Sequence, residues 1–522
     1  METFDVAVVG LGPSGATAAL LFAEAGLTVA AFERDREVYP LPRAVAMDGE
    51  VVRAFQRIGR GEALARLLQP TRPGSRAGFA NARREWLFGQ PFVPFGANGW
   101  PPTSMFDQPE IDAYLRATVV AHPRITPFIG HEVVGWEDSG DQVALRARVA
   151  DAGPGKETEL AARYLIACDG AASGIRRGLD IGWHDLGYDH EWLVVDVVVK
   201  PGHQLGEDTL QVCDPDRLTT FVVTKDPFRR WEFKLNPGET REEMLKPEKI
   251  QALLDTWTPR ETYEIRRSAV YQFHAATADS WRRGRVLLAG DAAHQTPPFL
   301  GQGMNAGLRD VINLAWKLPL VIAGTAGDAL LDTYEAERSA HARDLVQWAV
   351  AIGQLMEHLA SVEAAERQGL PPPEVPSAAR SSGYGQGREA PPLRDGVMMV
   401  DQVSDEGSTG YLFRQPMVRD REGREFLLDE RLGDGFAIVA RTAADLEVNA
   451  QSRELIERLG MVTMTLEGLE ACQGRFDPLF ESAAAAVVRP DRYVFGHVME
   501  TATDALSLDG LLDALRVKLS LA

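Results

Sequence analysis

The first 33 residues alternate between apolar runs and a helix of small residues. Residues 4–10, FDVAVVG, form an apolar run of strand length, and residues 28–33, TVAAFE, form a second one. Between them, residues 16–26, ATAALLFAEAG, have the composition of a closely packed helix. The order strand, helix, strand over so short a stretch predicts a βαβ unit with parallel strands.

Later segments have different patterns. From about residue 190, short β-rich runs alternate with turn residues, which predicts an antiparallel sheet inserted into the first fold. The run RVLLA at 285–289 returns to that fold, and helical periodicity follows over 304–318 and 331–350. A stretch rich in Pro, Gly and Ser is typical of a linker, and a small α/β unit follows it. We therefore expect a first domain over 1–185 and 275–365, an inserted sheet over 186–274 with parts of 70–104, a linker over 366–395 and a C-terminal domain over 396–522.

The turn after the first strand has the spacing GxGxxG. Gly10 suits a tight turn, Gly12 lets backbone approach a pyrophosphate, and Gly15 lets the helix lie close to the sheet. The helix N-terminus offers free N–H groups and a positive dipole to that pyrophosphate. Glu33 lies 23 residues after Gly10, where a carboxylate can accept a hydrogen bond from a ribose hydroxyl. The segment predicts an adenine dinucleotide site but does not separate NAD from FAD.

Two further signatures follow apolar strands. The segment CDGAASGIR, which begins at Cys168 and contains Asp169 and Ser173, comes directly after the strand YLIA. Gly290 and Asp291 come directly after RVLLA, and PPFLGQGMNAG follows at 297–307. Taken alone, the first can be a turn capped by Ser173 and the second a glycine-rich helix entry. Their order and spacing together point to one ligand.

The residue types of the third signature indicate how it could bind a ligand. Asp291 stands where a strand ends, so its carboxylate can accept hydrogen bonds from sugar-like hydroxyls. Gly301 and Gly303 let backbone N–H groups approach a flat ring. They also begin a helix whose positive end would face that ring.

Bulk composition narrows the class of protein. A length of 522 residues suggests two to four domains, and a net charge of −20 argues against nucleic acid and anionic membrane surfaces as partners. The cysteines Cys168, Cys213 and Cys472 form no CxxC motif, which suggests free thiols in a reducing cytoplasm. We expect no signal peptide, no membrane helix and no metal site.

The three signatures resemble the fingerprints of the class A flavin-dependent aromatic hydroxylases, which share the para-hydroxybenzoate hydroxylase fold, over about residues 1–365. The resemblance implies an α/β fold with a Rossmann-type FAD-binding domain, an inserted antiparallel β-sheet substrate domain and a C-terminal thioredoxin-like domain. It implies bound FAD, with NADH or NADPH and O₂ as co-substrates. The residues it assigns to FAD are Gly10, Gly12, Pro13, Ser14, Gly15, Glu33, Arg34, Arg43, Gln108, Asp169, Gly170, Gly290, Asp291, Gly301, Gly303, Met304 and Asn305.

The stretches YPLPRAVAMDGE and LLAGDAAHQTPPFLGQGMNAGLRD are most similar to the subgroup that hydroxylates 3-(3-hydroxyphenyl)propionate. This likeness implies ortho-hydroxylation of a phenolic aromatic acid through a flavin C4a-hydroperoxide. It places Pro298 and Gly301 at the reaction centre, with His294 as either a helper of phenol deprotonation or a structural residue. The subgroup often has Pro where this chain has Leu218. Substrate residues are expected from the inserted sheet: Gln211, Cys213, Thr220, Phe221, Trp231 and Phe233.

Other readings stay open. The same chemistry could act on a bulkier polycyclic or polyketide phenol. A halogenase of this fold would carry a WxWxIP stretch, which the sequence lacks, while an epoxidase or Baeyer–Villiger catalyst is a further option. A different class would be an NAD-dependent dehydrogenase without flavin. Because Cys472 has no nearby partner, dithiol chemistry is excluded for the C-terminal domain. The expected partner is a small phenol, and a homodimer is an alternative to a monomer.

Overall fold

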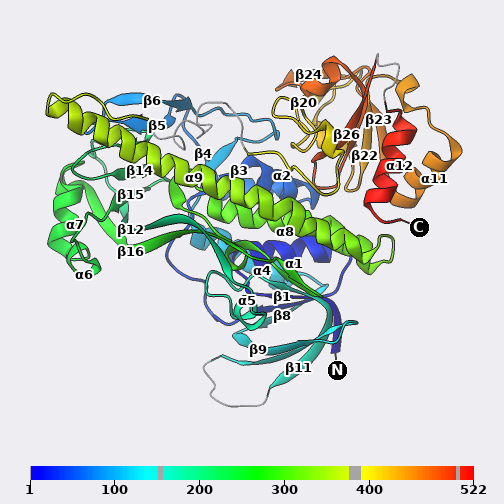
Figure 1. The fold of residues 1–522 in the computed structure, drawn as a ribbon, viewed down its shortest axis with the longest axis horizontal. Coiled ribbons are helices and arrows are strands. Elements are labelled where there is room, and N and C mark those ends of the chain that lie inside the picture. The colour runs from blue at the N-terminus through cyan, green and yellow to red at the C-terminus, as the bar shows by residue number, and fades with distance from the viewer. Residues whose placement is uncertain (1, 151–156, 376–389, 501–505, 522) are drawn as a thin grey trace.

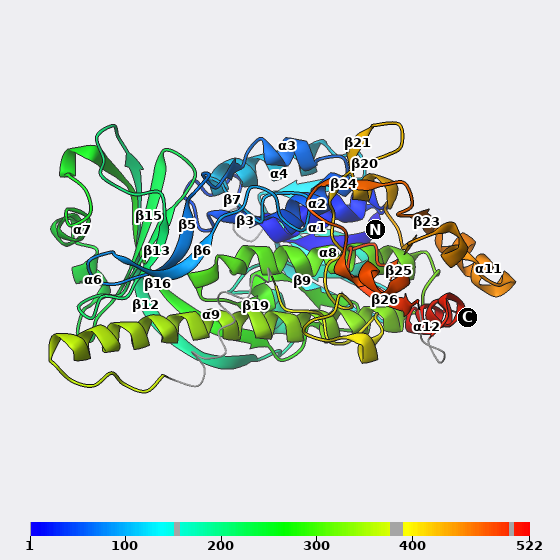
Figure 2. The ribbon, with the colours of Figure 1, turned by 90° about the horizontal axis from the view of Figure 1, so that it is seen from above.

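The computed structural model describes residues 2–150, 157–375, 390–500 and 506–521. Its inserted sheet, with two short helices, lies at one end of the molecule (Figure 1). The C-terminal domain packs beside the first domain toward the other end (Figures 1 and 2).

The first domain is built on a parallel sheet with the strand order β17-β18-β11-β1-β2-β8. Strands β18, β11, β1, β2 and β8 run parallel, and their apolar runs are buried. β10 and β9 extend the sheet from β11 as an antiparallel branch. The strands are β1 (Glu2–Val9), β2 (Val29–Glu33), β8 (Ile125–Ile129), β9 (His131–Asp138), β10 (Val143–Val149), β11 (Thr158–Ala167), β17 (Arg282–Arg283) and β18 (Val286–Leu288).

Helices and a small sheet complete this domain. The predicted βαβ unit is confirmed, with α1 between β1 and β2. A small antiparallel sheet has the order β3-β7-β4. The elements are α1 (Pro13–Glu24), α2 (Gly49–Arg57), α3 (Gly61–Ala65), α4 (Gln108–Ala121), α5 (Gly174–Gly178), β3 (Ala46–Asp48), β4 (Gln69–Pro70) and β7 (Thr103–Met105).

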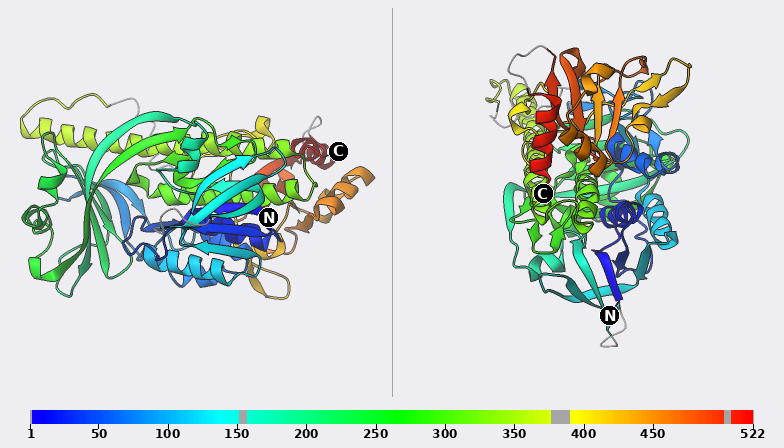
Figure 3. Two further views of the ribbon diagram at one scale, coloured as in Figure 1. Left: turned by 90° about the horizontal axis from the view of Figure 1, so that it is seen from below. Right: turned by 90° about the vertical axis from the view of Figure 1, so that its right-hand side faces the viewer.

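The inserted sheet has the order β19-β16-β12-β15-β14-β13-β5-β6. All its pairings are antiparallel except β13 with β5, which is parallel. Its longest strands, β12 and β16, curve toward the parallel sheet (Figure 3, left). The elements are β5 (Arg76–Ala80), β6 (Trp86–Pro91), β12 (Trp183–Val199), β13 (Thr209–Val212), β14 (Thr219–Val223), β15 (Phe228–Lys234), β16 (Tyr263–Ala278), β19 (His294–Gln295), α6 (Arg241–Met244) and α7 (Pro247–Leu254).

Two long helices connect the parts. α8 (Gln302–Ile322) packs against α1, and α9 (Asp332–Arg367) contacts α8, β12 and β16. α9 therefore runs along the molecule from the inserted sheet to the C-terminal domain (Figure 2). It extends beyond the predicted 331–350 into the stretch that we expected to be a linker, of which residues 376–389 lie outside the described ranges.

The C-terminal domain contains two small sheets, with the orders β23-β22-β25-β26 and β21-β20-β24. In the first, β22 and β23 are parallel, while β25 is antiparallel to both of its neighbours. The elements are β20 (Met417–Arg419), β21 (Glu425–Leu427), β22 (Ala437–Ala440), β23 (Val462–Thr465), β24 (Glu470–Gln473), β25 (Ala483–Val488), β26 (Val494–Met499), α11 (Ala450–Leu459) and α12 (Leu508–Lys518).

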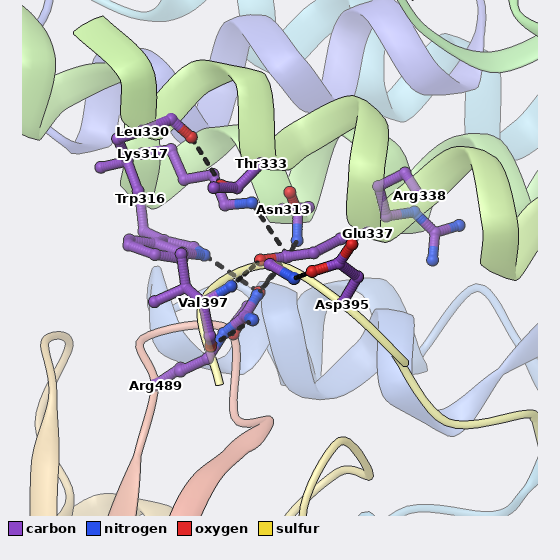
Figure 4. Close-up of polar contacts among 12 residues, drawn as sticks. Asn313, Trp316, Lys317, Leu330, Thr333, Glu337, Arg338, Asp395, Val397 and Arg489 are labelled. Carbon is purple, nitrogen blue, oxygen red and sulfur yellow. Dashed lines mark hydrogen bonds and ion pairs between the residues drawn. The ribbon is translucent and has the colours of Figure 1, made fainter. Parts of the chain in front are cut away.

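Buried charges hold the C-terminal domain against α8 and α9 (Figure 4). Glu337 of α9 pairs with Lys317 of α8 at 2.9 Å and with Arg489 of the C-terminal domain at 2.8 Å. Arg489 also pairs with Asp491 at 2.5 Å, and the indole N–H of Trp316 donates to Asp491 at 2.9 Å. We call these five residues, with Asn313, the docking cluster. A second buried pair, Arg53 with Asp429 at 2.7 Å, lies elsewhere on the same interface.

None of the helices in the described ranges has the length and apolar character needed to cross a membrane.

Candidate active site

The three glycine-containing signatures meet at the carboxyl ends of β1, β11 and β18. A Cβ on Gly10, whose φ is +92°, would lie 2.4 Å from the carbonyl oxygen of Cys168, beside the second signature. Ser14 packs against the third signature: a Cβ on Gly290 or Gly307 would lie 2.9 Å or 2.6 Å from its hydroxyl oxygen. Neighbouring parallel strands bring these turns to one edge of the sheet.

One glycine of each signature faces open space. A Cβ on Gly12, Gly170 or Gly303 would meet nothing within 4 Å. Gly15, by contrast, is packed, since its Cβ would lie 1.8 Å from the carbonyl oxygen of Gly10. The free edges of these turns are therefore backbone surfaces that a ligand can approach, beside the N-termini of α1 and α8. This arrangement fits a dinucleotide whose pyrophosphate lies at α1 and whose ring system lies at α8.

Glu33 stands at the end of β2 as expected for a ribose contact. Its carboxylate accepts hydrogen bonds from the backbone N–H of Leu11 and of Asp35, both at 2.9 Å. Arg116 lies 3.9 Å away. Each carboxylate oxygen keeps a lone pair for a hydroxyl. Arg34 points into solvent, with its side chain 71% exposed.

Gln108 organises the loop that carries Arg43. Its amide oxygen accepts from the N–H of Arg43 at 2.8 Å and from the N–H of Ala44 at 2.7 Å. The Arg43 guanidinium is exposed and lies over the ring of Tyr39. Gln108 thus shapes the loop through its backbone.

The two aspartates of the later signatures are held differently. Asp169 accepts from the hydroxyl of Ser173 at 2.6 Å and from the N–H of Ile175 at 3.1 Å, so it fixes the start of α5. Within the described residues Asp291 accepts no hydrogen bond, and the residue is exposed. Desolvation by nearby protein atoms raises the pKa of its carboxyl, and His294 and Arg43 partly offset the effect. Asp291 is therefore free to bind a hydroxylated chain.

The N-terminus of α8 is shaped by its first residues. Gly301 has φ of +64° and begins the helix, and no acidic side chain lies in the first turn. The amide of Asn305 donates to the carbonyl oxygens of Gly301 and Ala46, which ties this turn to β3. Met304 is partly buried beside the core of the first domain.

His294 lies in the core. Its ring is 1% exposed and stacks on Trp281, with the ring centroids 5.4 Å apart. Its Nε2 lies 2.8 Å from Asp310, which also accepts from Arg338 at 3.0 Å. The carboxylate of Asp310 accepts from the backbone N–H of Gly290 as well, so this group braces the turn before Asp291. The geometry favours the structural alternative for His294.

Gln211 and Thr220 lie where the inserted sheet meets the Pro298 turn. The hydroxyl of Thr220 donates to the amide oxygen of Gln211 at 2.6 Å. The amide of Gln211 donates to the carbonyl oxygen of Phe299, next to Pro298, at 3.4 Å. Cys213, directly after the end of β13, is buried in the same hydrophobic cluster as Phe299. These candidates thus gather around the Pro298 turn.

The aromatic candidates lie on the opposite side of the sheet. Phe221, Trp231 and Phe233 are buried in a hydrophobic cluster with Ile250 and Leu254 of α7. Side chains alternate between faces along a strand, so this side is separated from Gln211 and Thr220 by the sheet itself. We do not retain these three aromatics in the proposed substrate site.

The sheet instead turns a polar face toward the first domain. We call it the inner face; it is the side that carries Gln211, Thr220, Glu232, Val194 and Ala269, which are register partners across β13, β14, β15, β12 and β16. Its charged residues are absent from the candidates predicted from the sequence, because alternation indicates which residues share a face but not which face is covered. A signal for this face is present in the segment RRWEF, where Arg230 and Glu232 alternate with Trp231 and Phe233.

A group of buried charged residues lies on the inner face, two residues along the strands from the register partners named above. Asp196 accepts from the Arg230 guanidinium at 2.7 Å and lies 3.5 Å from Arg267. Arg230 also donates to the carbonyl oxygen of Arg43 at 2.6 Å, and Arg267 donates to that of Pro42. The inner face is therefore fastened to the loop that Gln108 organises.

Two family models match this chain. A family model described as "FAD binding domain" matches residues 3–349, and one described as "HcaD C-terminal domain" matches residues 410–511. The chain is 35% identical over 442 residues to a 3-(3-hydroxy-phenyl)propionate/3-hydroxycinnamic acid hydroxylase of Mycobacterium sp. (strain JLS), covering 83% of this chain and 75% of that protein.

A second relative and a solved structure extend over nearly the whole chain. A "Probable NADH-specific resorcinol 4-hydroxylase" of Rhodococcus jostii (strain RHA1) is 33% identical over 528 residues, covering 98% of this chain and 94% of that one. The crystal structure of a ternary complex of aklavinone-11 hydroxylase with FAD and aklavinone has a TM-score of 0.78 at 25% identity and covers 99% of both chains. The chain therefore belongs to the FAD-binding-domain family, and it is a flavin-dependent aromatic hydroxylase that uses FAD.

Proposed function

We propose that the enzyme uses NADH or NADPH and O₂ to hydroxylate a phenol that bears a short carboxylate chain, at the position ortho to its hydroxyl. 3-(3-Hydroxyphenyl)propionate is the substrate that the subgroup likeness suggests, and the names of several relatives support it. Bound FAD would supply the activation of O₂ and the transfer of one oxygen atom. The protein's own residues supply position, charge and exclusion of water.

The observation that carries the substrate class is a buried cation on the inner face. Arg267 is 6% exposed, and its Nη2 has no hydrogen-bond partner among the described residues. A guanidinium with an unused N–H group is suited to a carboxylate. A phenolic acid would satisfy this donor, whereas a neutral phenol would leave it unpaired.

The rest of the site fits ring hydroxylation. The start of α8 presents positive dipole to anionic charge, worth roughly 0.3–1 kcal/mol and up to ~2 kcal/mol where partly buried. Pro297 and Pro298 limit the backbone freedom of the turn beside Gln211. A phenol held there would present its electron-rich ortho carbon at reacting distance, roughly 3–3.5 Å.

The proposal also covers the fold of the C-terminal domain and the alternative functions. The strand order β23-β22-β25-β26, with α11 joining β22 to β23, supports a thioredoxin-like C-terminal domain. A flavin-free dehydrogenase is not retained, because the family match is to an FAD-binding domain. A bulkier polycyclic phenol is the second candidate, favoured by the similarity to the aklavinone-11 hydroxylase structure along the whole chain.

The test supplies 3-(3-hydroxyphenyl)propionate, NADH or NADPH, and O₂, and identifies the product. Coupled formation of the catechol supports the proposal. If that acid yields only hydrogen peroxide while a polycyclic phenol is hydroxylated cleanly, the second candidate replaces it. A variant Arg267→Met should raise KM for the acid and leave KM for 3-ethylphenol nearly unchanged.

A further inference from the structure

Glu232 is the exception among the buried carboxylates of the described residues. It is 5% exposed, yet it forms no hydrogen bond or ion pair there. Every other carboxylate that is as buried has such a partner: Glu50, Asp107, Asp196, Asp310, Glu337, Asp429, Asp477 and Asp491. An unpartnered buried carboxylate is costly to folding, so its presence points to a ligand.

The strand register places Glu232 on the inner face. It lies opposite Thr220 on β14 and opposite Val194 on β12, so all three project to the same side. Thr220 donates a hydrogen bond to Gln211, which in turn donates to the carbonyl oxygen of Phe299, beside Pro298. Arg230, two residues before Glu232, reaches the carbonyl oxygen of Arg43. The neighbours of Glu232 on this face therefore contact two loops of the FAD-binding domain, at Arg43 and at Phe299.

Given the proposed function, on which this inference rests, we propose that Glu232 is a catalytic residue whose carboxylate accepts the proton of the substrate's phenolic hydroxyl. In this step the phenol O–H bond breaks and a carboxyl O–H bond forms. The electron pair stays on the phenol oxygen, which then donates density to its ortho carbon. The products of the step are an aryl oxide and a neutral carboxylic acid, and no oxidant takes part.

The electrostatic surroundings suit a base near neutral pH. Burial raises the pKa of Glu232 to about 7, Arg230 partly offsets this, and Asp196 adds to it. The other titratable or charged groups on this side are Arg267 and Tyr271 of β16, Tyr188 and His190 of β12, and Lys234 of β15. Lys234 and His190 both lie against Glu357 of α9. A base with its pKa near the working pH transfers protons most effectively.

The experiment compares the FAD-loaded wild-type enzyme with the variant Glu232→Gln. The matched control is Glu264→Gln on β16, whose side chain is 66% exposed and pairs with Lys200. Without NAD(P)H, the Kd of 3-(3-hydroxyphenyl)propionate and of 3-phenylpropionate is measured from the flavin absorbance. We expect Glu232→Gln to weaken only the phenol, by about tenfold.

The pH profile of hydroxylation gives the second readout. In the wild type, kcat/KM should rise with pH through about 7 as Glu232 loses its proton. In Glu232→Gln the rate should fall by roughly 10²–10⁴-fold and this rise should disappear. A fluorinated phenol with a more acidic hydroxyl should recover part of the rate. Glu264→Gln should match the wild type.

Two results would overturn the role of Glu232 while leaving the proposed function intact. One is a wild-type rate and pH profile in Glu232→Gln. The other is an equal loss of affinity for both ligands, which would show a structural defect only. If the wild-type enzyme hydroxylates neither this phenol nor a polycyclic one, the proposed function fails, and the role of Glu232 fails with it.

Discussion

The docking cluster and the inner face each contain a buried glutamate, and the two glutamates differ in their hydrogen-bond partners. Glu337 accepts from Arg489, Asn313 and the backbone N–H of Val397 (Figure 4). Glu232 has no such partner among the described residues. A buried charge with satisfied hydrogen bonds can fasten two domains, whereas an unsatisfied one is retained where it serves a ligand.

The difference also appears in the pKa values. Arg489 and Lys317 outweigh the cost of burial and lower the pKa of Glu337 to about 2. At Glu232 burial prevails and raises the pKa to about 7. The same type of side chain is therefore always ionised in the docking cluster and titrates near neutrality on the inner face.

The largest effect is expected from breaking the docking cluster. Arg489→Ala leaves Asp491 without its buried cation and leaves Glu337 with Lys317 as its remaining cation, so it should lower the free energy of unfolding by about 3–5 kcal/mol. Denaturant titration measures this. The control Arg441→Ala removes an exposed pair with Glu500 and should cost below about 1 kcal/mol. Equal losses in the two variants would remove the distinction between buried and exposed pairs.

Neutralising the unpaired carboxylate should have the opposite sign. A folded-state pKa of about 7, against an ordinary 4.5, means that the folded protein holds the proton more tightly. Wild-type stability should therefore fall between pH 4.5 and about 7, and Glu232→Gln should be more stable at pH 8, by up to about 3 kcal/mol. Unfolding of the FAD-free protein at pH 5 and pH 8 checks this. A variant less stable than the wild type at pH 8 would contradict it.

Asp291 is the second carboxylate left free for a ligand. We propose that Asp291 accepts a hydrogen bond from the ribityl chain of FAD. Asp291→Ala would then leave a donor of the cofactor unpaired, which costs roughly 1–3 kcal/mol, or about tenfold to a hundredfold in Kd. Fluorescence titration of the apoprotein with FAD measures the loss. Asp279→Ala, outside the three signatures, is the control. Unchanged FAD affinity in Asp291→Ala would argue against a cofactor contact.

The smallest effect is expected at Cys472, which is exposed and whose thiol donates to the carbonyl oxygen of Met417 at 3.3 Å. The C-terminal domain contacts α8 and α9 through the docking cluster, which does not include Cys472. Cys472→Ser should therefore keep both hydroxylation and stability. Steady-state turnover and a thermal melt check this. Loss of turnover with FAD bound and the fold intact would give that domain a chemical role.

The sequence by itself determined the FAD-binding part. Apolar strands, glycine spacing and strand-end acids are local features, and parallel strands bring their carboxyl ends to one edge, so Gly10, Asp169 and Gly290 had to meet. It also predicted Gln211 and Thr220 as substrate candidates, because both lie on β-rich segments of the inserted sheet, and the structure places them beside the carbonyl oxygen of Phe299.

Only the tertiary structure decided which side of that sheet faces the cofactor domain. Trp231 and Glu232 alternate along one strand, and both sides of β15 are buried, so neither period nor hydrophobicity distinguishes them. The packing of α7 on the aromatic side settles it and leaves the charged side for the site. Likewise, the docking cluster joins residues about 150 positions apart, such as Glu337 and Arg489, and no local pattern in the chain encodes such a pair.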